Sequence, residues 1–329
     1  MNLPEKNLQL QKWIVLVAIV LFAIKIIAYF LTRSVAILTD ALESTVNVVA
    51  GLIGLYSLYI ASKPSDQNHP YGHGKAEFLS AAVEGTLIVV AGFVIIYKAI
   101  NNFINPQPIQ KLDYGILLIA TTAFINLIFG ILSIKQGKKN NSLALVASGR
   151  HLQSDTFSTV GIIAGLVIIY FTNLLWLDGA IAILFALIIM YTGYTILRKS
   201  VAGIMDEADT TLLEEMVMVL NKNRRQNWVD LHNLRVIKYG GRLHVDSHLT
   251  VPWYFNVNEA HVEIEELSKL IREQFSNSME LFVHSDGCQY FQCPICYKDA
   301  CPVRKHPFEK RIEWTIENVL ADKKHRGTD

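Results

Sequence analysis

Long apolar runs fill residues 13–200, whereas residues 206–329 mix apolar and polar positions as soluble domains do. A helix needs roughly 20 consecutive apolar residues to cross a bilayer. Only Thr32–Ser34 separates the first two runs, which predicts a tight helical hairpin. We expect six membrane-spanning helices, near Trp13–Leu31, Val35–Ile60, Phe78–Phe103, Tyr114–Ile134, Leu143–Tyr170 and Leu174–Leu197.

Short amphipathic segments replace the long apolar runs after residue 206. Apolar positions have helical spacing in Leu212–Asn221 and Asn258–Phe275, and three further segments look like strands: Asp230–Lys238, Arg242–Pro252 and Met279–His284. The resulting order αββαβ is typical of a ferredoxin-like α+β layer. We therefore predict an α-helical membrane protein with a six-transmembrane-helix bundle (residues 1–203) and a C-terminal cytosolic ferredoxin-like domain (204–287). A Cys-rich extension (288–329) with an amphipathic helix at Glu309–Leu320 completes the chain.

The positions of lysine and arginine predict how the chain is oriented in the membrane. Basic residues precede span one and follow spans two, four and six, all on the same predicted side. They are Lys6, Lys12, Lys63, Lys75, Lys135, Lys138, Lys139, Arg198 and Lys199. The opposite side carries little beyond Arg33 and Lys111, so both termini are predicted to be cytoplasmic. The first span lacks a small-residue cleavage site, which argues against a signal peptide. A buried helix cluster in a soluble protein is the alternative reading of the runs.

Charged side chains interrupt two of the predicted spans, where charges are costly and usually face a bundle interior or a water-filled path. Glu43 and Asn47 are four residues apart in span two, as are His151 and Asp155 in span five, so each pair lies on one helix face. Two opposed faces would offer carboxylate, amide and imidazole ligands to one borderline divalent ion such as zinc, iron, cobalt or manganese. A structural hydrogen-bond network or a proton relay without metal is the alternative.

The loop between spans two and three carries Asp66, His69 and His73 at plausible metal-ligand spacing. Pro70 and two neighbouring glycines predict a turn here, where histidines are more often simply solvated. The soluble domain is also rich in histidine, and the alternation of strand Arg242–Pro252 places His244, Asp246 and His248 on one face. A second candidate metal site is therefore expected among the histidines of this domain and one acid: His232, His244, His248, His261, His284 and Asp286.

All four cysteines of the chain fall within 14 residues of the extension, spaced C-x4-C-x2-C-x4-C: Cys288, Cys293, Cys296 and Cys301. Cytosolic thiols stay reduced, so a disulfide framework is not expected. The central CPIC segment is typical of zinc sites, and a structural zinc is our preferred interpretation. An iron–sulfur cluster or a tail without metal are the alternatives.

Three stretches together resemble the cation diffusion facilitator family, especially its bacterial zinc and iron exporters. These are HLQSD in span five, DQNHPYGHGKAE after span two, and the LHNLR, DSHLTV, EAHVEI and VHSDG series in the soluble domain. The resemblance covers residues 10–287. It implies a multi-pass homodimer in the bacterial inner membrane that moves protons inward as metal moves out. The net charge of +1 gives no reason to expect nucleic acid as a partner.

The resemblance also implies roles for individual residues. The transport site falls on Glu43, Asn47, His151 and Asp155, and the loop site on Asp66, His69 and His73. The cytosolic site, binuclear in relatives, falls on His232, His248, His261, His284 and Asp286. An interlock between the third span and the soluble domain maps onto Lys75 and Asp206. The cysteine extension lies outside the common family pattern.

Two positions depart from that pattern, because relatives commonly have Asp or His where this chain has Glu43 and Asp where it has Asn47. The neutral amide weakens the field on a bound cation and removes one group that can exchange protons. We expect a metal/proton antiporter, not an enzyme, with zinc as the first candidate cargo and iron as the second. Manganese, cobalt or cadmium export, an importer, or a membrane-anchored metal sensor without transport activity are the alternatives. An intramembrane metalloprotease would need H-E-x-x-H, which the sequence lacks.

Overall fold

The computed structural model describes residues 3–61, 63–105, 109–139, 143–239, 242–275 and 279–327. The chain divides into two compact units. The first comprises Met1–Tyr59 and Phe78–Val201, and the second joins the short stretch Ile60–Glu77 to Ala202–Asp329. Each unit is described by itself.

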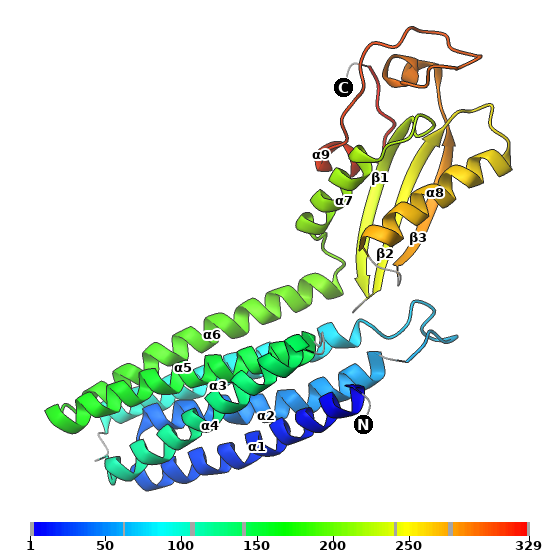
Figure 1. Ribbon diagram of the computed structural model, residues 1–329. Helices are drawn as coiled ribbons and strands as arrows, with labels where there is room; N and C mark the ends of the chain where they lie inside the picture. Colours follow the sequence, from blue (N-terminus) through cyan, green and yellow to red (C-terminus); the bar gives the residue numbers. More distant parts are fainter. Residues whose placement is uncertain are drawn as a thin grey trace. The chain divides into compact units, whose positions relative to one another are not determined.

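Six long helices, packed side by side, form the first unit (Figure 1). They are α1 (Leu3–Thr32), α2 (Val35–Ala61), α3 (Ala76–Ile104), α4 (Leu112–Lys139), α5 (Leu143–Thr172) and α6 (Trp176–Ile204). Helices α2 to α6 each contain a stretch long and apolar enough to cross a membrane. The apolar part of α1 within the described residues is shorter, Leu16–Thr32. The predicted six-helix bundle is confirmed, with helix ends within seven residues of those expected except at the N-terminus of α1.

A buried carboxylate from α6 fixes the start of α2. Arg33 adopts a positive φ of 61° in the two-residue connection from α1, as a tight helical hairpin requires. The Ser34 hydroxyl and the backbone N–H groups of Val35 and Ala36 all donate to the carboxylate of Asp178, which is fully buried. Because the first N–H groups of a helix have no partner within the helix, an anion there both satisfies and stabilises them.

Helices α3 and α6 approach closely at a pair of glycines. A methyl group added at Gly85 would lie 2.8 Å from the carbonyl oxygen of Gly193 and 2.9 Å from the backbone nitrogen of Leu197. Both atoms belong to the backbone of α6 and cannot rotate away. Small residues at such crossings allow the close helix packing on which membrane helix association depends.

Replacing Gly85 by alanine is therefore expected to separate α3 from α6 and to lower stability by about 1–3 kcal/mol, the usual cost of overpacking. Gly54 is the matched control, since a methyl group there would meet nothing within 4 Å. Alanine at Gly54 should leave stability unchanged or slightly raised, because alanine favours helix. Thermal unfolding of both purified variants in detergent measures the difference. Equal melting temperatures would contradict the proposed crossing.

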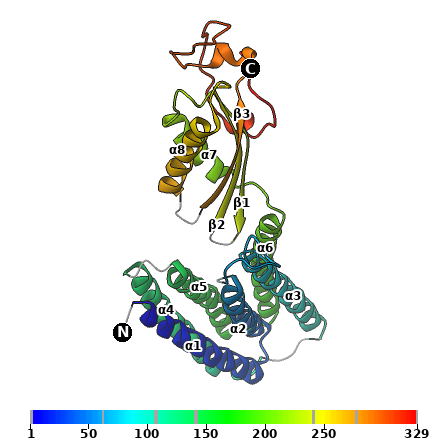
Figure 2. The same ribbon diagram turned by 90° about the vertical axis from the view of Figure 1, so that its right-hand side faces the viewer.

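The second unit contains a three-stranded sheet with two helices, visible in Figure 2. Its elements follow the predicted order: α7 (Thr210–Lys222), β1 (Asp230–Tyr239), β2 (Arg242–Val251), α8 (Val257–Phe275) and β3 (Met279–Gly287). Strand β1 pairs antiparallel with β2, and β2 pairs parallel with β3. The predicted αββαβ domain is confirmed. A 3-10 helix, η1 (Tyr290–Ile295), and a single turn, α9 (Ile316–Val319), follow.

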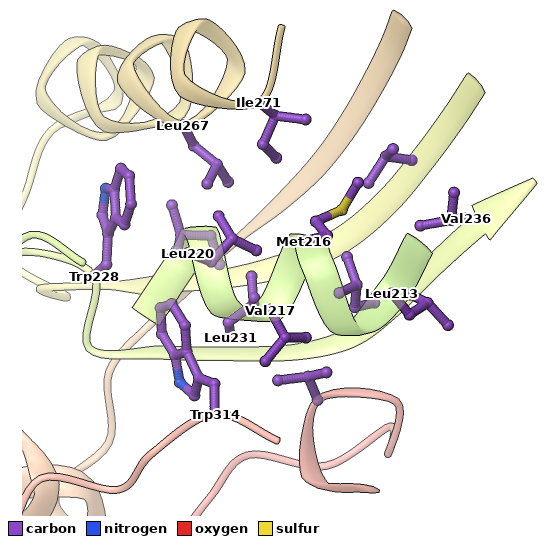
Figure 3. Packing of buried hydrophobic residues seen from close by; sticks show 14 of the residues in the cluster. Leu213, Met216, Val217, Leu220, Trp228, Leu231, Val236, Leu267, Ile271 and Trp314 are labelled. Atoms are coloured by element: carbon purple, nitrogen blue, oxygen red, sulfur yellow. The ribbon is translucent and has the colours of Figure 1, made fainter. Parts of the chain in front are cut away.

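The core of this unit includes the C-terminal extension. Side chains of α7 meet those of the sheet and of Leu267 and Ile271 from α8 (Figure 3). Trp314 joins the same cluster from the extension and is 2% exposed. The Arg224 guanidinium stacks over the Trp314 ring at 4.0 Å and donates to the Ile312 carbonyl. The extension is therefore folded onto the domain as part of its core.

The amphipathic helix predicted over Glu309–Leu320 is wrong for most of its length, since only Ile316–Val319 is helical. The preceding backbone bonds to other segments. The N–H groups of Glu309 and Lys310 donate to the carbonyl of Pro294, and that of Trp314 donates to the side chain of Asn221. Backbone groups committed to these partners cannot form the i to i−4 ladder, so periodic apolar positions alone misled the prediction.

Candidate metal-binding sites

The four predicted transport-site residues line one cavity inside the helical unit. The cavity has a volume of about 160 Å³, and its walls come from α2, α3, α5 and α6. Its polar lining consists of Glu43 and Asn47 from α2, Glu84 from α3, His151, Ser154, Asp155 and Ser158 from α5, and Thr192 from α6. The i,i+4 spacing thus brings the two polar faces to a common space. Sequence reasoning missed Glu84, an isolated acid in an apolar span.

Asp155 is the central group of this cavity. Asn47 Nδ2 donates to Asp155 Oδ2 at 3.1 Å, and His151 Nε2 lies 3.9 Å from the same oxygen. Asp155 is buried, whereas the His151 side chain is 52% exposed. Within the described residues the ligand atoms of Glu43, His151 and Asp155 do not all lie within 4.8 Å of one another. The arrangement offers carboxylate, amide and imidazole groups around one space, with Asp155 already hydrogen-bonded to one of the other three.

A buried ion pair lies beside this cavity and was not predicted. Lys25 Nζ of α1 donates to Asp40 Oδ1 of α2 at 2.8 Å, and both side chains are 2% exposed. The Thr159 hydroxyl of α5 donates to the same Asp40 oxygen at 2.8 Å. The signal was present, because a lysine in the middle of an apolar span is a functional candidate by default.

The three residues of the predicted loop site lie close together in the second unit. Asp66 accepts hydrogen bonds from the backbone N–H groups of Asn68 and His69, which hold its pKa below the usual value, the bond from His69 contributing most. The two rings approach its carboxylate, His69 Nδ1 at 3.3 Å and His73 Nε2 at 3.5 Å. One ligand atom from each of the three residues lies within 4.8 Å of the others. This group can bind a divalent cation.

The predicted interlock residues are in contact. Lys75 Nζ lies 2.9 Å from Asp206 Oδ2 and 4.8 Å from the centre of the Tyr239 ring. Tyr71 from the same loop stacks on Tyr239 with ring centres 5.7 Å apart. The loop Ile60–Glu77 is therefore attached to the sheet domain by one ion pair and by aromatic contacts.

Strand register explains how the cytosolic histidines meet. His232 of β1 pairs directly with His248 of β2, and His248 pairs with His284 of β3, so the three residues form one row across the sheet. A β-bulge between His232 and Arg235 interrupts the β1 register at the end of this row. Bulges are frequent next to functional sites because they redirect a side chain.

Asp286 lies among these imidazoles. Its carboxylate is 3.4 Å from His232 Nε2, 3.5 Å from His248 Nδ1 and 3.8 Å from His284 Nε2. His232, His248 and Asp286 offer ligand atoms within 4.8 Å of one another. Burial lowers the pKa of His232, so its ring is neutral near pH 7, as a metal ligand must be. His261 is not in this group, although it lines a neighbouring pocket together with Asp286.

Two residues of the C-terminal segment contact acidic side chains of the sheet, Asp286 and Asp230. The sequence did not predict these contacts. Lys324 Nζ lies 3.2 Å from Asp286 Oδ1 and also donates to the Gly287 carbonyl. His325 is buried and hydrogen-bonds Asp230 through both its ring and its backbone N–H. Burial opposes ionisation of Asp230, but the bonds from His325 outweigh it and lower the Asp230 pKa. An ammonium group thus already neutralises part of the candidate site.

Comparison with known proteins identifies the two units. The family model described as the cation efflux transmembrane domain matches residues 12–205, and that of the cation efflux protein cytoplasmic domain matches residues 209–288. An uncharacterized transporter of Synechocystis is 32% identical over 79% of this chain and 84% of its own length.

Two further relatives carry functional names. The manganese efflux system protein MneP of Bacillus subtilis is 28% identical over 84% of this chain and 96% of its own length. The cation-efflux pump FieF of Shewanella oneidensis is 25% identical over 83% of this chain and 91% of its own length. With both of its units matched in order, this multi-pass membrane protein belongs to the cation efflux, or cation diffusion facilitator, family of metal exporters.

Proposed function

We propose that the protein exports a divalent transition metal from the cytoplasm in exchange for protons, through the cavity that contains Glu43, Asn47, His151 and Asp155. The observation that carries this proposal is the convergence of these four residues, from two helices, on one cavity among the spans. The protein acts as a homodimer in the bacterial inner membrane with both termini in the cytoplasm. The match to the family's cytoplasmic domain supports the dimer.

Proton exchange follows from the chemistry of the ligands. Imidazole and carboxylate bind a metal only when deprotonated, so loading the cavity from the cytoplasm releases protons from His151 and a carboxylate. Histidine titrates near neutral pH, so small changes in its surroundings exchange a proton for a cation. Alternating access around a fixed site then exposes the metal to the other side, where protons displace it.

Zinc is the first candidate cargo and iron the second. A set of one imidazole, one amide and carboxylates suits borderline divalent ions better than calcium, which prefers six to eight oxygen ligands. One relative is a manganese efflux system protein, which keeps manganese among the ions to be tested. Asn47 is the residue that favours a cargo other than zinc, because it contributes no charge.

A competition series in reconstituted vesicles tests the proposal. Flux of zinc, ferrous iron, manganese, cobalt and cadmium is measured with and without an imposed proton gradient. We expect zinc and ferrous iron to be transported fastest, with rates that rise when protons can flow against the metal. Metal binding without flux of any ion would favour a membrane-anchored metal sensor over a transporter. Metal flux that does not depend on the proton gradient would contradict antiport.

Replacing Asn47 by aspartate is expected to tighten zinc binding at the transport site. An added negative charge at coordinating distance contributes at least about 1.4 kcal/mol, or tenfold in affinity. The zinc concentration for half-maximal flux should fall accordingly, and more protons should be exchanged per metal ion. Parallel vesicle assays of zinc flux and internal pH measure both quantities. The Asn47→Gln variant retains the neutral amide. It should neither lower the zinc concentration for half-maximal flux nor raise the number of protons exchanged.

The cytosolic site is proposed to bind the same metal and to bias the dimer toward transport. Lys324 competes there with the metal, since its ammonium group lies 3.2 Å from the Asp286 carboxylate.

Replacing Lys324 by alanine should strengthen zinc binding about fivefold, corresponding to about 1 kcal/mol for this partly exposed ion pair. Lys323→Ala removes the same charge one residue away and serves as control. Equilibrium competition with a zinc indicator, with His248→Ala identifying the cytosolic component, measures the change; equal affinities in both lysine variants would contradict competition.

A further inference from the structure

The four cysteines lie on one short, well-anchored segment after β3 (Figure 1, orange). Cys288 follows the last residue of β3, and its N–H donates to the carbonyl of Val251 at the end of β2. Cys293 lies in η1, and the N–H of Cys296 donates to the carbonyl of Cys293, closing a turn. Cys296 is buried and the other three are half-buried, and none forms a disulfide.

A single arginine holds the backbone of this segment in place. Arg304 donates to the carbonyls of Cys293, Cys296 and Lys298 at distances of 3.1, 3.0 and 2.7 Å. The carbonyl of Pro294 accepts from two further backbone N–H groups downstream. The segment is thus fixed through its backbone carbonyl groups and not through disulfides.

The side chain of Tyr254 lies next to the thiols. The Tyr254 hydroxyl is buried and lies beside the Cys301 thiol. Cys288 lies close to each of the other three cysteines. Four thiols and a hydroxyl therefore gather in one partly buried region of the domain.

We propose that Cys288, Cys293, Cys296 and Cys301 together bind one thiophilic metal centre, separate from the transport, loop and cytosolic sites. Four thiolates from one short segment, with a two-residue spacing at its middle, form the donor set that zinc and iron–sulfur clusters both use. The centre does not depend on the transport function, because none of its ligands belongs to the other three sites.

The arrangement of the sulfur atoms favours a cluster over a single ion. A tetrahedral zinc with Zn–S bonds of about 2.3 Å holds its sulfur atoms roughly 3.8 Å apart. No three of the Sγ atoms, all within the described segment 279–327, lie within 4.8 Å of one another. A cluster spreads its cysteine ligands over several iron atoms, and the first three cysteines have the C-x4-C-x2-C spacing of plant-type iron–sulfur proteins.

The whole chain purified without oxygen tests the site. We expect roughly two to four iron atoms per chain with a similar amount of acid-labile sulfide, and visible absorption that bleaches on reduction. Because the chain has four cysteines in all, maleimide labelling reports on these thiols alone. Labelling should reach fewer than one thiol per native chain and four after denaturation with a chelator. The Cys293→Ser/Cys296→Ser double variant should lose at least about nine-tenths of the iron.

The His248→Ala variant is the matched control, since it removes a ligand of the cytosolic site and should keep iron, sulfide and thiol protection unchanged. One zinc per chain without sulfide, lost in the double cysteine variant, would keep the four-thiolate site and overturn the cluster. Four thiols that all react in the native chain, with no metal lost in the double variant, would overturn the site itself. Neither result bears on metal flux in vesicles, so this proposal and the proposed function fail separately.

Discussion

Replacing Asp155 by alanine is expected to reduce metal flux in vesicles by at least about 100-fold. Residues that merely hydrogen-bond a metal ligand cost 10–100-fold when they are changed, so loss of a charged ligand should cost more. Asp155 is the group on which Asn47 and His151 converge, at 3.1 and 3.9 Å. Its removal leaves the cavity with one carboxylate from α2 and one from α3, which do not replace it on the α5 face.

Two companion variants separate loss of charge from loss of structure. Asp155→Asn keeps the volume and the hydrogen-bonding capacity but cannot ionise, so it should fail as badly as alanine. Asp113→Ala removes an exposed carboxylate from the first turn of α4, outside the cavity, and should transport normally. Undiminished flux in either Asp155 variant, at equal protein content in the vesicles, would remove the proposed site.

Much of the site was predictable because local spacing decides which side chains share a face. The i,i+4 pairs of α2 and α5 needed only helical geometry to be placed on common faces, and the structure brings both to one cavity. The alternation of β2 placed His248 in the same way. What spacing could not give is strand register, which sets His232, His248 and His284 in one row. Register depends on pairing between segments far apart in the chain.

The features that sequence reasoning missed all depend on how separate segments dock. Lys324 reaches Asp286 only because the extension folds back over the domain, with Trp314 in the core. The failed helix over Glu309–Leu320 has the same cause, because its backbone bonds to Pro294 and Asn221 replaced the helical ladder. Propensity and periodicity describe a segment by itself, and tertiary contacts override them where the two compete.

The ion pair between Lys25 and Asp40 is expected to be the most sensitive structural element of the bundle. Replacing Lys25 by methionine leaves the carboxylate of Asp40 buried without its counter-charge. Removing one partner of a buried pair costs about 3–5 kcal/mol, so thermal unfolding in detergent should shift strongly downward. Thr159 donates to the same oxygen as Lys25, and the other oxygen of Asp40 has no hydrogen-bond partner within the described residues. Among the described residues, no other side chain neutralises the carboxylate of Asp40.

The double variant Lys25→Met/Asp40→Leu distinguishes a structural pair from one that takes part in transport. With both charges gone, no uncompensated charge remains, and stability should return close to that of the parent protein, as it does when buried pairs are replaced by apolar groups. Metal flux of this stable variant is then the informative measurement. Because Asp40 precedes Glu43 by one helical turn, we expect flux to fall even though the fold recovers. Full flux would make the pair purely structural, and a double variant no more stable than Lys25→Met would contradict the ion pair itself.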